Sequence, residues 1–266
     1  MARYAIELSY DGTGYSGWQS QPGGAGVQDA VERAFAELGE RVRVAGAGRT
    51  DAGVHARAQV AHADLSREWD PGRLAAGLNS KLPPSVVCMD AARVGEYFHA
   101  RRSAVLREYR YFIWNAPACY PHIRPYVLWL RGGRYDWQRA ISAAGMFAGT
   151  HDFRAFCRTK DCPGNTARTV SRSKLSRRGP LLVFSIAANS YLTNMIRIAI
   201  GNLLEIASGR RGENWLRDLL DGAGRRASAR TVPPSGLFFW RVDYPVEVFR
   251  RGWGSRAAAA PPPIRP

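Results

Sequence analysis

The alternation of apolar and polar residues predicts strands and helices in turn along the first hundred residues. Residues 3–10 alternate as in a half-buried strand, and Asp-Gly-Thr-Gly at 11–14 supplies turn residues directly after it. From 27 to 38, apolar residues recur at helical spacing while charged residues occupy the opposite face. We also expect strands at 41–46, 57–64 and 85–94, and a helix at 71–79.

The second half of the chain repeats this theme. The pattern predicts strands at 107–115, 168–176 and 181–188, and helices at 136–148 and 190–207. Short strands and helices in this order are typical of α+β layers, and a duplicated βαβ-type half would explain the repetition. We therefore expect an N-terminal α+β half at 1–104 and a C-terminal α+β half at 105–251. Residues 252–266, rich in Ala and Pro, are expected to be a disordered tail.

The composition indicates a globular protein with a polyanionic partner. Of 266 residues, 45% are hydrophobic, which is enough to bury a core in one large domain or in two packed ones. Lys and Arg number 38 against 22 for Asp and Glu, a formal charge of +16. This excess predicts binding to a nucleic acid. Three of the cations are lysines and 35 are arginines, which suits phosphate and base contacts, although a high-GC genome produces the same bias.

The cysteines and the N-terminus indicate a cytoplasmic location. Cys88, Cys119, Cys157 and Cys162 form no CxxC pair, and no two-histidine zinc pattern accompanies them, so we expect reduced thiols. The chain begins directly with an alternating strand rather than a basic region followed by an apolar signal stretch. No run of eighteen uncharged apolar residues occurs. We expect a soluble protein that is not exported.

A single arginine interrupts the most apolar of the predicted helices. Residues 191–206 read YLTNMIRIAIGNLLEI, with Arg197 in the middle and Glu205 two turns away. Because an arginine keeps its proton, its burial requires an anionic partner or a phosphate. Two interpretations fit this pattern. The side chain reaches water at the surface, or it pairs with a carboxylate from elsewhere in the chain.

Asp51 is the best candidate for that carboxylate. It stands in GRTDAGVHA, residues 48–56, whose small residues let the backbone pass close to another surface and leave the side chain facing a cleft. An aspartate before Ala-Gly also makes an ordinary turn, in which the carboxylate binds its own backbone. The spacing alone leaves both interpretations open.

Aromatic and basic residues alternate at the start of the second half. In a strand, Tyr109 and Tyr111 point to one face and Arg110 to the other. The tyrosines are either core residues or surfaces on which bases stack. Basic runs at 98–102 and 172–178 are either solvated faces or a track for phosphates, and we assign Arg101 and Arg102 to phosphate contacts.

Together these segments resemble the tRNA pseudouridine synthase A family from Tyr4 to about Pro245. The blocks that carry the resemblance are YDGTGYSGWQSQP, VQDAVERAF, AGRTDAGVHA, FHARRSA, REYRYFIWN, GTHDFRAF, LTNMIRIAIGNLL and SGLFFWRVDYP. Their order along the chain also matches, so no single short pattern carries the resemblance. Small departures, such as Ile196 where the family more often has valine, keep the chemical character.

The resemblance implies an enzyme that converts uridine to pseudouridine at positions 38, 39 and 40 of the tRNA anticodon arm, without a cofactor or metal. It implies two similar halves of ferredoxin-like origin, with joined antiparallel or mixed sheets around a central basic cleft, in a homodimer. Asp51 matches the catalytic nucleophile, Tyr109 the tyrosine that stacks on the base, Arg197 the arginine paired with the aspartate, and Leu237 a pocket residue. Arg49 matches a residue tied to RNA binding and base extrusion.

Two other functions compete with this one. A noncatalytic RNA-binding module explains the charge and the tyrosines, but not an arginine in an apolar helix together with an isolated aspartate. A hydrolytic nucleosidase also breaks a C1'–N bond, but glycoside-type hydrolysis generally uses two carboxyl groups. The recognised blocks offer only Asp11 and Asp152 as a second acid, and both contexts are typical of turns and caps.

Overall fold

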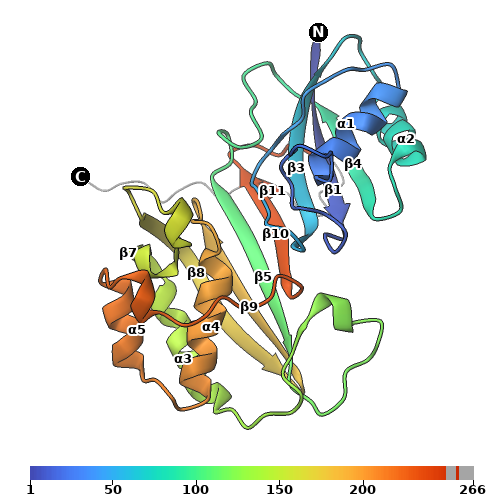
Figure 1. Cartoon of the computed structure of the whole chain (residues 1–266). Helices are drawn as coiled ribbons and strands as arrows, with labels where there is room; N and C mark the ends of the chain where they lie inside the picture. The colour runs from blue at the N-terminus through green and yellow to red at the C-terminus, as the bar shows by residue number, and fades with distance from the viewer. Residues whose placement is uncertain (250–255, 258–266) are drawn as a thin grey trace. The chain divides into compact units, whose positions relative to one another are not determined.

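A computed structural model describes residues 1–249 and 256–257, and the chain divides into two compact units. Unit 1 comprises Met1–Arg107 and the chain from Phe238 onward, and unit 2 comprises Glu108–Leu237. Figure 1 shows a sheet with helices on one face in each of them. The structure is thus an α+β fold with mixed sheets and five α-helices among the described residues.

Unit 1 contains a sheet with the strand order β4-β1-β3-β10. Its strands are β1 (Ala2–Tyr10), β2 (Ala45–Gly46), β3 (His55–Leu65), β4 (Val86–Arg93), β10 (Leu237–Tyr244) and β11 (Arg256–Ala257). β1 is antiparallel to both β3 and β4, whereas β10 is parallel to β3 at Phe238 and Phe239. Through this pairing, the chain from Phe238 onward groups with unit 1, while the sequence pattern places 238–251 with the second half.

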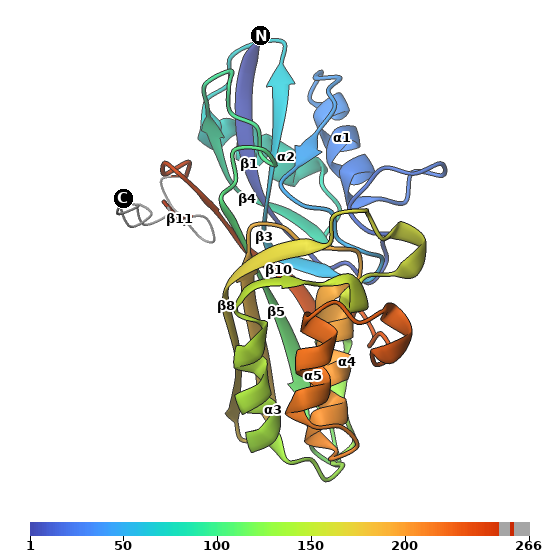
Figure 2. The same cartoon turned by 90° about the vertical axis from the view of Figure 1, so that its left-hand side faces the viewer.

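The two helices of unit 1 follow the predicted pattern closely. α1 (Val27–Glu37) buries the residues at helical spacing, Val31 and Phe35 among them, and the Asp29 carboxylate accepts the Gly26 backbone N–H at 2.9 Å. α2 (Pro71–Lys81) begins after Asp70, whose carboxylate accepts the Arg73 N–H at 2.9 Å. Acceptors at these positions satisfy amide groups that a helix leaves open at its start. Both helices cover the same face of the sheet (Figures 1 and 2).

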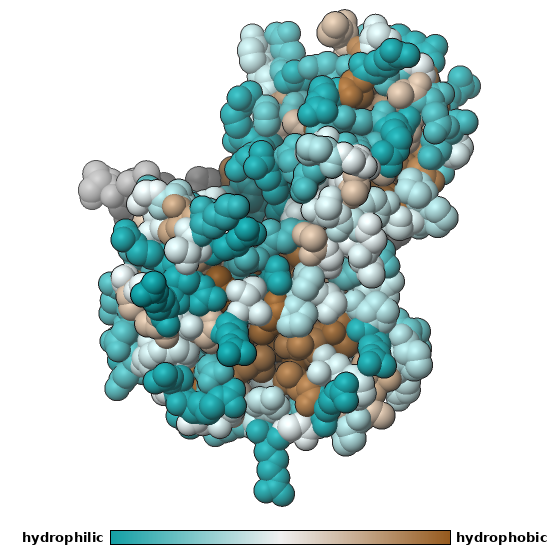
Figure 3. All heavy atoms as spheres, in the orientation of Figure 1, coloured by the Kyte–Doolittle hydropathy of each residue, from teal (hydrophilic) through white to brown (hydrophobic). Residues whose placement is uncertain are grey.

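Unit 2 contains a sheet with the strand order β5-β9-β8-β7. Its elements are β5 (Leu106–Trp114), β6 (Leu128–Trp129), α3 (Trp137–Ala144), β7 (Gly149–Asp152), β8 (Ala167–Arg178), β9 (Leu181–Ala188), α4 (Met195–Ala207) and α5 (Glu213–Leu220). Short 3-10 turns occur at 124–126, 145–147, 154–156, 159–161 and 225–227. The three α-helices lie on one face of the sheet (Figure 2). On the face shown in Figure 3, apolar atoms gather in the middle of the unit and hydrophilic atoms surround them.

Several boundaries differ from the prediction. The helix expected at 190–207 begins only at Met195, because Asn194 has a φ of +65°, a left-handed conformation that cannot lie inside an α-helix. The strand expected at 41–46 is reduced to Ala45–Gly46, since the Val44 N–H is taken by the Glu32 side chain at 2.9 Å. The expected elements did not include α5, β7 or β10.

Further observations concern the thiols, the tail and membrane spans. All four cysteines are free, as expected. The tail predicted at 252–266 lies outside the described residues apart from Arg256–Ala257, which pair with β10. Within the described part of the chain, no helix is both long and apolar enough to cross a membrane.

Candidate functional site

The segment between β2 and β3 carries Asp51 on a tight turn, which we call the Asp51 loop (residues 47–54). The Val54 N–H donates to the Asp51 carbonyl oxygen at 3.1 Å, and Gly53 has a φ of +75°, which favours glycine. Asp51 itself is half-buried and Arg49 is exposed. The turn therefore fixes the backbone of the aspartate while leaving part of its side chain accessible.

The loop between β1 and α1 packs directly on the Asp51 loop. The Trp18 N–H donates to the Thr50 carbonyl at 3.0 Å, and the buried hydroxyls of Tyr10 and Thr50 lie 2.8 Å apart. At Gly17, where φ is +102°, a Cβ would lie 2.4 Å from the Thr50 carbonyl oxygen. Burial raises the pKa of Tyr10 to about 12, so its hydroxyl stays neutral at physiological pH. The residue that precedes Asp51 is thus held by both backbone and side chain.

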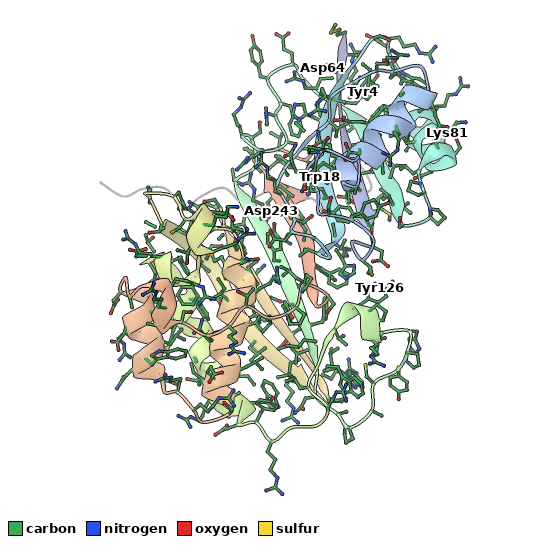
Figure 4. All side chains as sticks on the ribbon, in the orientation of Figure 1. Tyr4, Trp18, Asp64, Lys81, Tyr126 and Asp243 are labelled. Atoms are coloured by element: carbon green, nitrogen blue, oxygen red, sulfur yellow. The ribbon has the colours of Figure 1, made fainter. Side chains whose placement is uncertain are left out.

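The other side of the Asp51 loop is held by strands of unit 1. The Gln59 side chain donates to the Gly48 carbonyl at 2.8 Å, and the Arg107 guanidinium donates to the Ala47 carbonyl at 3.2 Å. A Cβ on Gly48 would lie 2.7 Å from the ring of Phe239 in β10. Trp18, labelled in Figure 4, packs equally closely on Gly46. Four of the recognised sequence blocks therefore meet within this unit.

Asp11 and Asp152 have the turn and cap roles expected of them. Asp11 accepts the backbone N–H and the hydroxyl of Thr13 at 2.9 and 2.6 Å. Asp152 accepts the Arg154 N–H at 2.9 Å and the Thr166 hydroxyl at 2.5 Å. Asp11 Oδ1 also lies 3.1 Å from Nδ1 of His55 in β3. The local hydrogen bonds of both carboxylates confirm the interpretation of their contexts as turn and cap.

Two histidines hold the loop that carries Arg101 and Arg102 in unit 1. His62 Nδ1 accepts the Ala100 N–H at 3.2 Å, and His99 Nδ1 accepts the N–H groups of Arg101 and Arg102 at 3.1 and 3.3 Å. Burial lowers the pKa of His62 to about 4, with the nearby His99 as a further cause. A neutral ring keeps the acceptor that the loop needs, and both arginine side chains are exposed at its surface.

In unit 2, Tyr109 and Leu237 are nearly buried. Tyr109 is 7% exposed and packs edge-to-face against Tyr191, with ring centroids 4.9 Å apart. Leu237 is 5% exposed at the start of β10. Tyr111 is also buried, and its hydroxyl donates to the Pro233 carbonyl at 2.7 Å, so it is a core residue. The predicted alternation is confirmed, since Arg110 between the two tyrosines is only half-buried.

Arg197 lies near the start of α4 rather than in its middle. Its Nε donates to the Val232 carbonyl at 2.8 Å and its Nη1 donates to Asn194 Oδ1 at 2.9 Å. The side chain is half-buried, in a helix whose other faces are almost entirely buried. Glu205, the acid on the same helix, binds Arg210 at 2.6 Å. The guanidinium is therefore oriented by two neutral oxygens of its own unit.

Sequence reasoning missed the ion-pair cluster around Glu108. This carboxylate is 2% exposed and binds Arg110 at 2.9 Å and Arg172 at 2.7 Å. Arg172 therefore forms an ion pair within the protein. For this reason the basic residues of 172–178 do not all face solvent as free phosphate-binding groups. The signal was present in the alternation, which places Glu108 and Arg110 on the face opposite to the tyrosines.

Comparisons with known proteins identify the family. The family model described as tRNA pseudouridine synthase matches residues 7–101 and 143–245. The tRNA pseudouridine synthase A of Shouchella clausii is 39% identical over 94% of this chain and 96% of its own. The chain belongs to the tRNA pseudouridine synthase A family. It is accordingly an isomerase, and the matched ranges contain every proposed site residue except Arg102 and Tyr109, which lie between them.

Other comparisons give the same relation. The family enzyme of Agrobacterium fabrum is 41% identical over 92% of this chain and 93% of its own, and that of Bordetella parapertussis is 40% identical over 93% and 92%. Among solved structures, one titled "Crystal Structure of a Cbf5-Nop10-Gar1 Complex" aligns with a TM-score of 0.35 and 12% identity, over 76% of this chain and 45% of that chain. This likeness is too weak to bear on the fold.

Proposed function

We propose that this tRNA pseudouridine synthase isomerises uridines 38, 39 and 40 in the anticodon arm, with Asp51 as its nucleophile. The observation that supports the role of Asp51 is the fixed position of its loop, which is held on one side by Trp18 and Tyr10 and on the other by Gln59 and Arg107. Catalysis by a carboxylate requires such positioning, because small displacements of a reacting group lower the rate strongly.

The reaction needs a group that stabilises the sugar or the base while the base turns. The bond between C1' and N1 of uridine breaks, the uracil rotates, and a bond forms between C1' and C5. C5 loses its proton and N1 takes up one, so the product is an isomer of uridine. A carboxylate can attack C6 of the base or C1' of the sugar, or it can promote a glycal, and Asp51 is compatible with each route. In all three, the product has the same composition as uridine, and no redox partner is required.

The other site residues take supporting roles in the proposal. Arg197, already oriented by Val232 and Asn194, is the residue that we propose to pair with Asp51. Tyr109 stacks on the flipped base and Leu237 lines the pocket. Extruding a base from its stack costs a few kcal/mol, which aromatic and cationic contacts offset.

RNA binding completes the assignment. Arg49, Arg101 and Arg102 are exposed in unit 1. We propose that Arg101 and Arg102 contact tRNA phosphates and that Arg49 binds the RNA and assists base extrusion. The enzyme acts in the cytoplasm on tRNA, as a homodimer and without a cofactor. Analytical ultracentrifugation tests the dimer, and a sedimenting monomer at micromolar concentration would contradict it.

One assay distinguishes this function from its rivals. The purified protein is given tRNA transcripts carrying tritium at C5 of uridine, each with uridine at only one of positions 38, 39 and 40. Joining C5 to C1' expels the tritium, whereas a nucleosidase releases free base and a binding module releases nothing. Release from none of the three transcripts would refute the proposed positions.

Variants of Asp51 test the nucleophile. Asp51→Asn removes the anionic oxygen and Asp51→Glu moves it by one methylene, so we expect both to bind tRNA and fold normally but to lose tritium release by several powers of ten. Circular dichroism and a tRNA filter-binding assay are the controls. A rate that falls only a few-fold in either variant would exclude Asp51 as the nucleophile.

A further inference from the structure

Unit 2 contains a basic pocket that none of the roles above uses. The pocket has a volume of about 420 Å³ and is lined by Arg158, Thr159, Lys160, Arg225, Arg226, Ser228, Ala229, Arg230 and Thr231. Five of these nine residues are cationic and none is acidic. Pockets for small neutral ligands are mostly apolar, so this lining selects for an anion instead.

Few of the cationic side chains that line the pocket form ion pairs with the described carboxylates. Arg158 pairs with Asp161 at 3.3 Å. Lys160, Arg225, Arg226 and Arg230 have no ion pair with any described carboxylate. The half-buried Arg225 is held by two long hydrogen bonds, to the Ser228 carbonyl at 3.3 Å and the Thr231 hydroxyl at 3.4 Å. The guanidinium of Arg225 is partly removed from water, and this burial lowers its pKa.

The pocket is built on a fixed support. Asn202 in α4, which is fully buried, donates to the Ser228 hydroxyl at 2.9 Å and accepts the Ala229 N–H at 3.0 Å. A Cβ on Gly201 would lie 2.2 Å from the Arg230 carbonyl oxygen, so the helix and the loop backbone are in direct contact. Figure 1 shows the segment after α5 running across α4. The arginines therefore project from a loop whose backbone is anchored, not from a flexible one.

The same loop is bonded to Arg197. Thr231 lines the pocket, and the next residue, Val232, accepts the Nε–H of Arg197 at 2.8 Å and donates its N–H to the Arg197 carbonyl at 3.4 Å. In the other segment that lines the pocket, the Arg158 N–H donates to the Thr193 carbonyl at 3.1 Å, just before α4 begins. Both lining segments are thus hydrogen-bonded to the start of the helix that carries the proposed active-site arginine.

We propose that the basic pocket binds a backbone phosphate of the tRNA and so anchors the RNA beside Arg197. This rests on the proposed function for the identity of the RNA, whereas the anion selectivity rests on the pocket alone. Arginine and lysine side chains contact phosphates without reading the sequence, so the pocket fixes the register of the RNA and not the choice of base. Free inorganic phosphate has the same chemistry, and the experiment distinguishes the two sources.

The test compares two double variants of equal charge. Lys160→Ala with Arg230→Ala removes two exposed cations of the pocket, and Arg134→Ala with Arg139→Ala removes two exposed cations of the same unit that do not line it. The equilibrium binding of tRNA is measured from 50 to 300 mM salt. The logarithm of the tRNA association constant falls as the logarithm of the salt concentration rises. Each lost phosphate contact makes this slope shallower by about 0.7–0.9 and weakens binding about tenfold at low salt.

We expect the pocket variant to lose about one to two units of slope and the control variant to keep the wild-type slope. Arg226→Ala, a single change in the pocket, should give the smaller loss and guards against a folding defect in the double variant. A pocket variant that keeps the wild-type slope would overturn the proposal. An equal loss of slope in the pocket and control variants would overturn it as well, because net charge alone would then explain binding.

Inorganic phosphate supplies the second arm. At constant ionic strength, phosphate should raise the unfolding temperature of the wild type more than that of the pocket variant. If it does so while the tRNA slopes of the two proteins agree, the pocket takes a free anion and the RNA proposal fails. Tritium release is measured in parallel, and we expect a raised KM with an unchanged kcat in the pocket variant. Absence of release by the wild type would refute the proposed function but not the slope comparison.

Discussion

Replacing Gly17 with alanine should displace the Asp51 loop and slow catalysis while leaving the protein folded. A Cβ at this position would lie 2.4 Å from the Thr50 carbonyl oxygen and 3.1 Å from the carbonyl carbon of Asp51. Ordinary contact begins at 3.4 Å, so the loop must retreat by about 1 Å. The φ of +102° adds backbone strain for any residue with a Cβ.

The size of both effects follows from this geometry. A misplacement of about 1 Å near the reacting atoms lowers the rate about 100-fold, so we expect kcat to fall by that factor. Strain and overpacking together should lower the free energy of unfolding by about 2–4 kcal/mol, which a domain of ordinary stability survives. Single-turnover tritium release measures the first effect and urea unfolding measures the second.

Gly14→Ala is the matched control in the same loop. A Cβ on Gly14 meets nothing within 4 Å and its φ is not in the left-handed range, so this variant should retain wild-type rate and stability. A Gly17→Ala enzyme that is folded and keeps kcat within about threefold of the wild type would refute the reasoning. The close packing of the loop would then have no part in positioning Asp51.

Two further predictions concern the stability of the folded protein, one through the titration of His62 and one through the coupling of Asp51 with Arg197. His62 has a pKa of about 4 in the folded protein and about 6.5 when unfolded, so its contribution to stability is complete above pH 6.5 and is lost as the pH falls toward 4, by up to about 3 kcal/mol. Urea unfolding of the wild type and of His62→Gln at pH 7 and pH 4.5 checks this, and an equal loss of stability in both proteins would contradict it. The proposed pairing of Asp51 with Arg197 predicts that Asp51→Asn combined with Arg197→Met is less destabilising than the sum of the single changes, because the first removes the charge that the second would strand. Unfolding of the four proteins measures the coupling, and additivity within about 0.5 kcal/mol would mean that the side chains do not meet.

Elements with a clear period were predictable from the sequence. β1, α1 and α2 occur within about two residues of their expected ranges, since alternation or helical spacing matches their burial. The late start of α4 was not predictable from the apolar pattern, because that pattern continues through residues 191–194 while Asn194 turns left-handed. α5 carried a usable signal, since Leu216, Leu219 and Leu220 have helical spacing.

The site was predictable in its residue types but not in its supports. The sequence blocks single out Asp51, yet the contacts that fix its loop join Tyr10, Trp18 and Gln59 to it across 11 to 40 positions of sequence. Such contacts depend on how the strands approach one another, which periodicity does not encode. The partners of Glu108 are of the same kind, because Arg172 reaches it from another strand, 64 residues away.

The position of β10 in the chain constrains how the protein can be made. Strand β3 pairs with Phe238 and Phe239, which a ribosome adds only after the whole of unit 2 has been synthesised. Until then, the edge of β3 at His55 and Ala56 has unpaired backbone groups, and Gly48 lacks the Phe239 ring that packs against it. A nascent chain therefore carries the complete GRTDAGVHA sequence long before the surroundings of Asp51 exist. Synthesis of β10, not of Asp51, therefore marks the moment at which the surroundings of Asp51 can form.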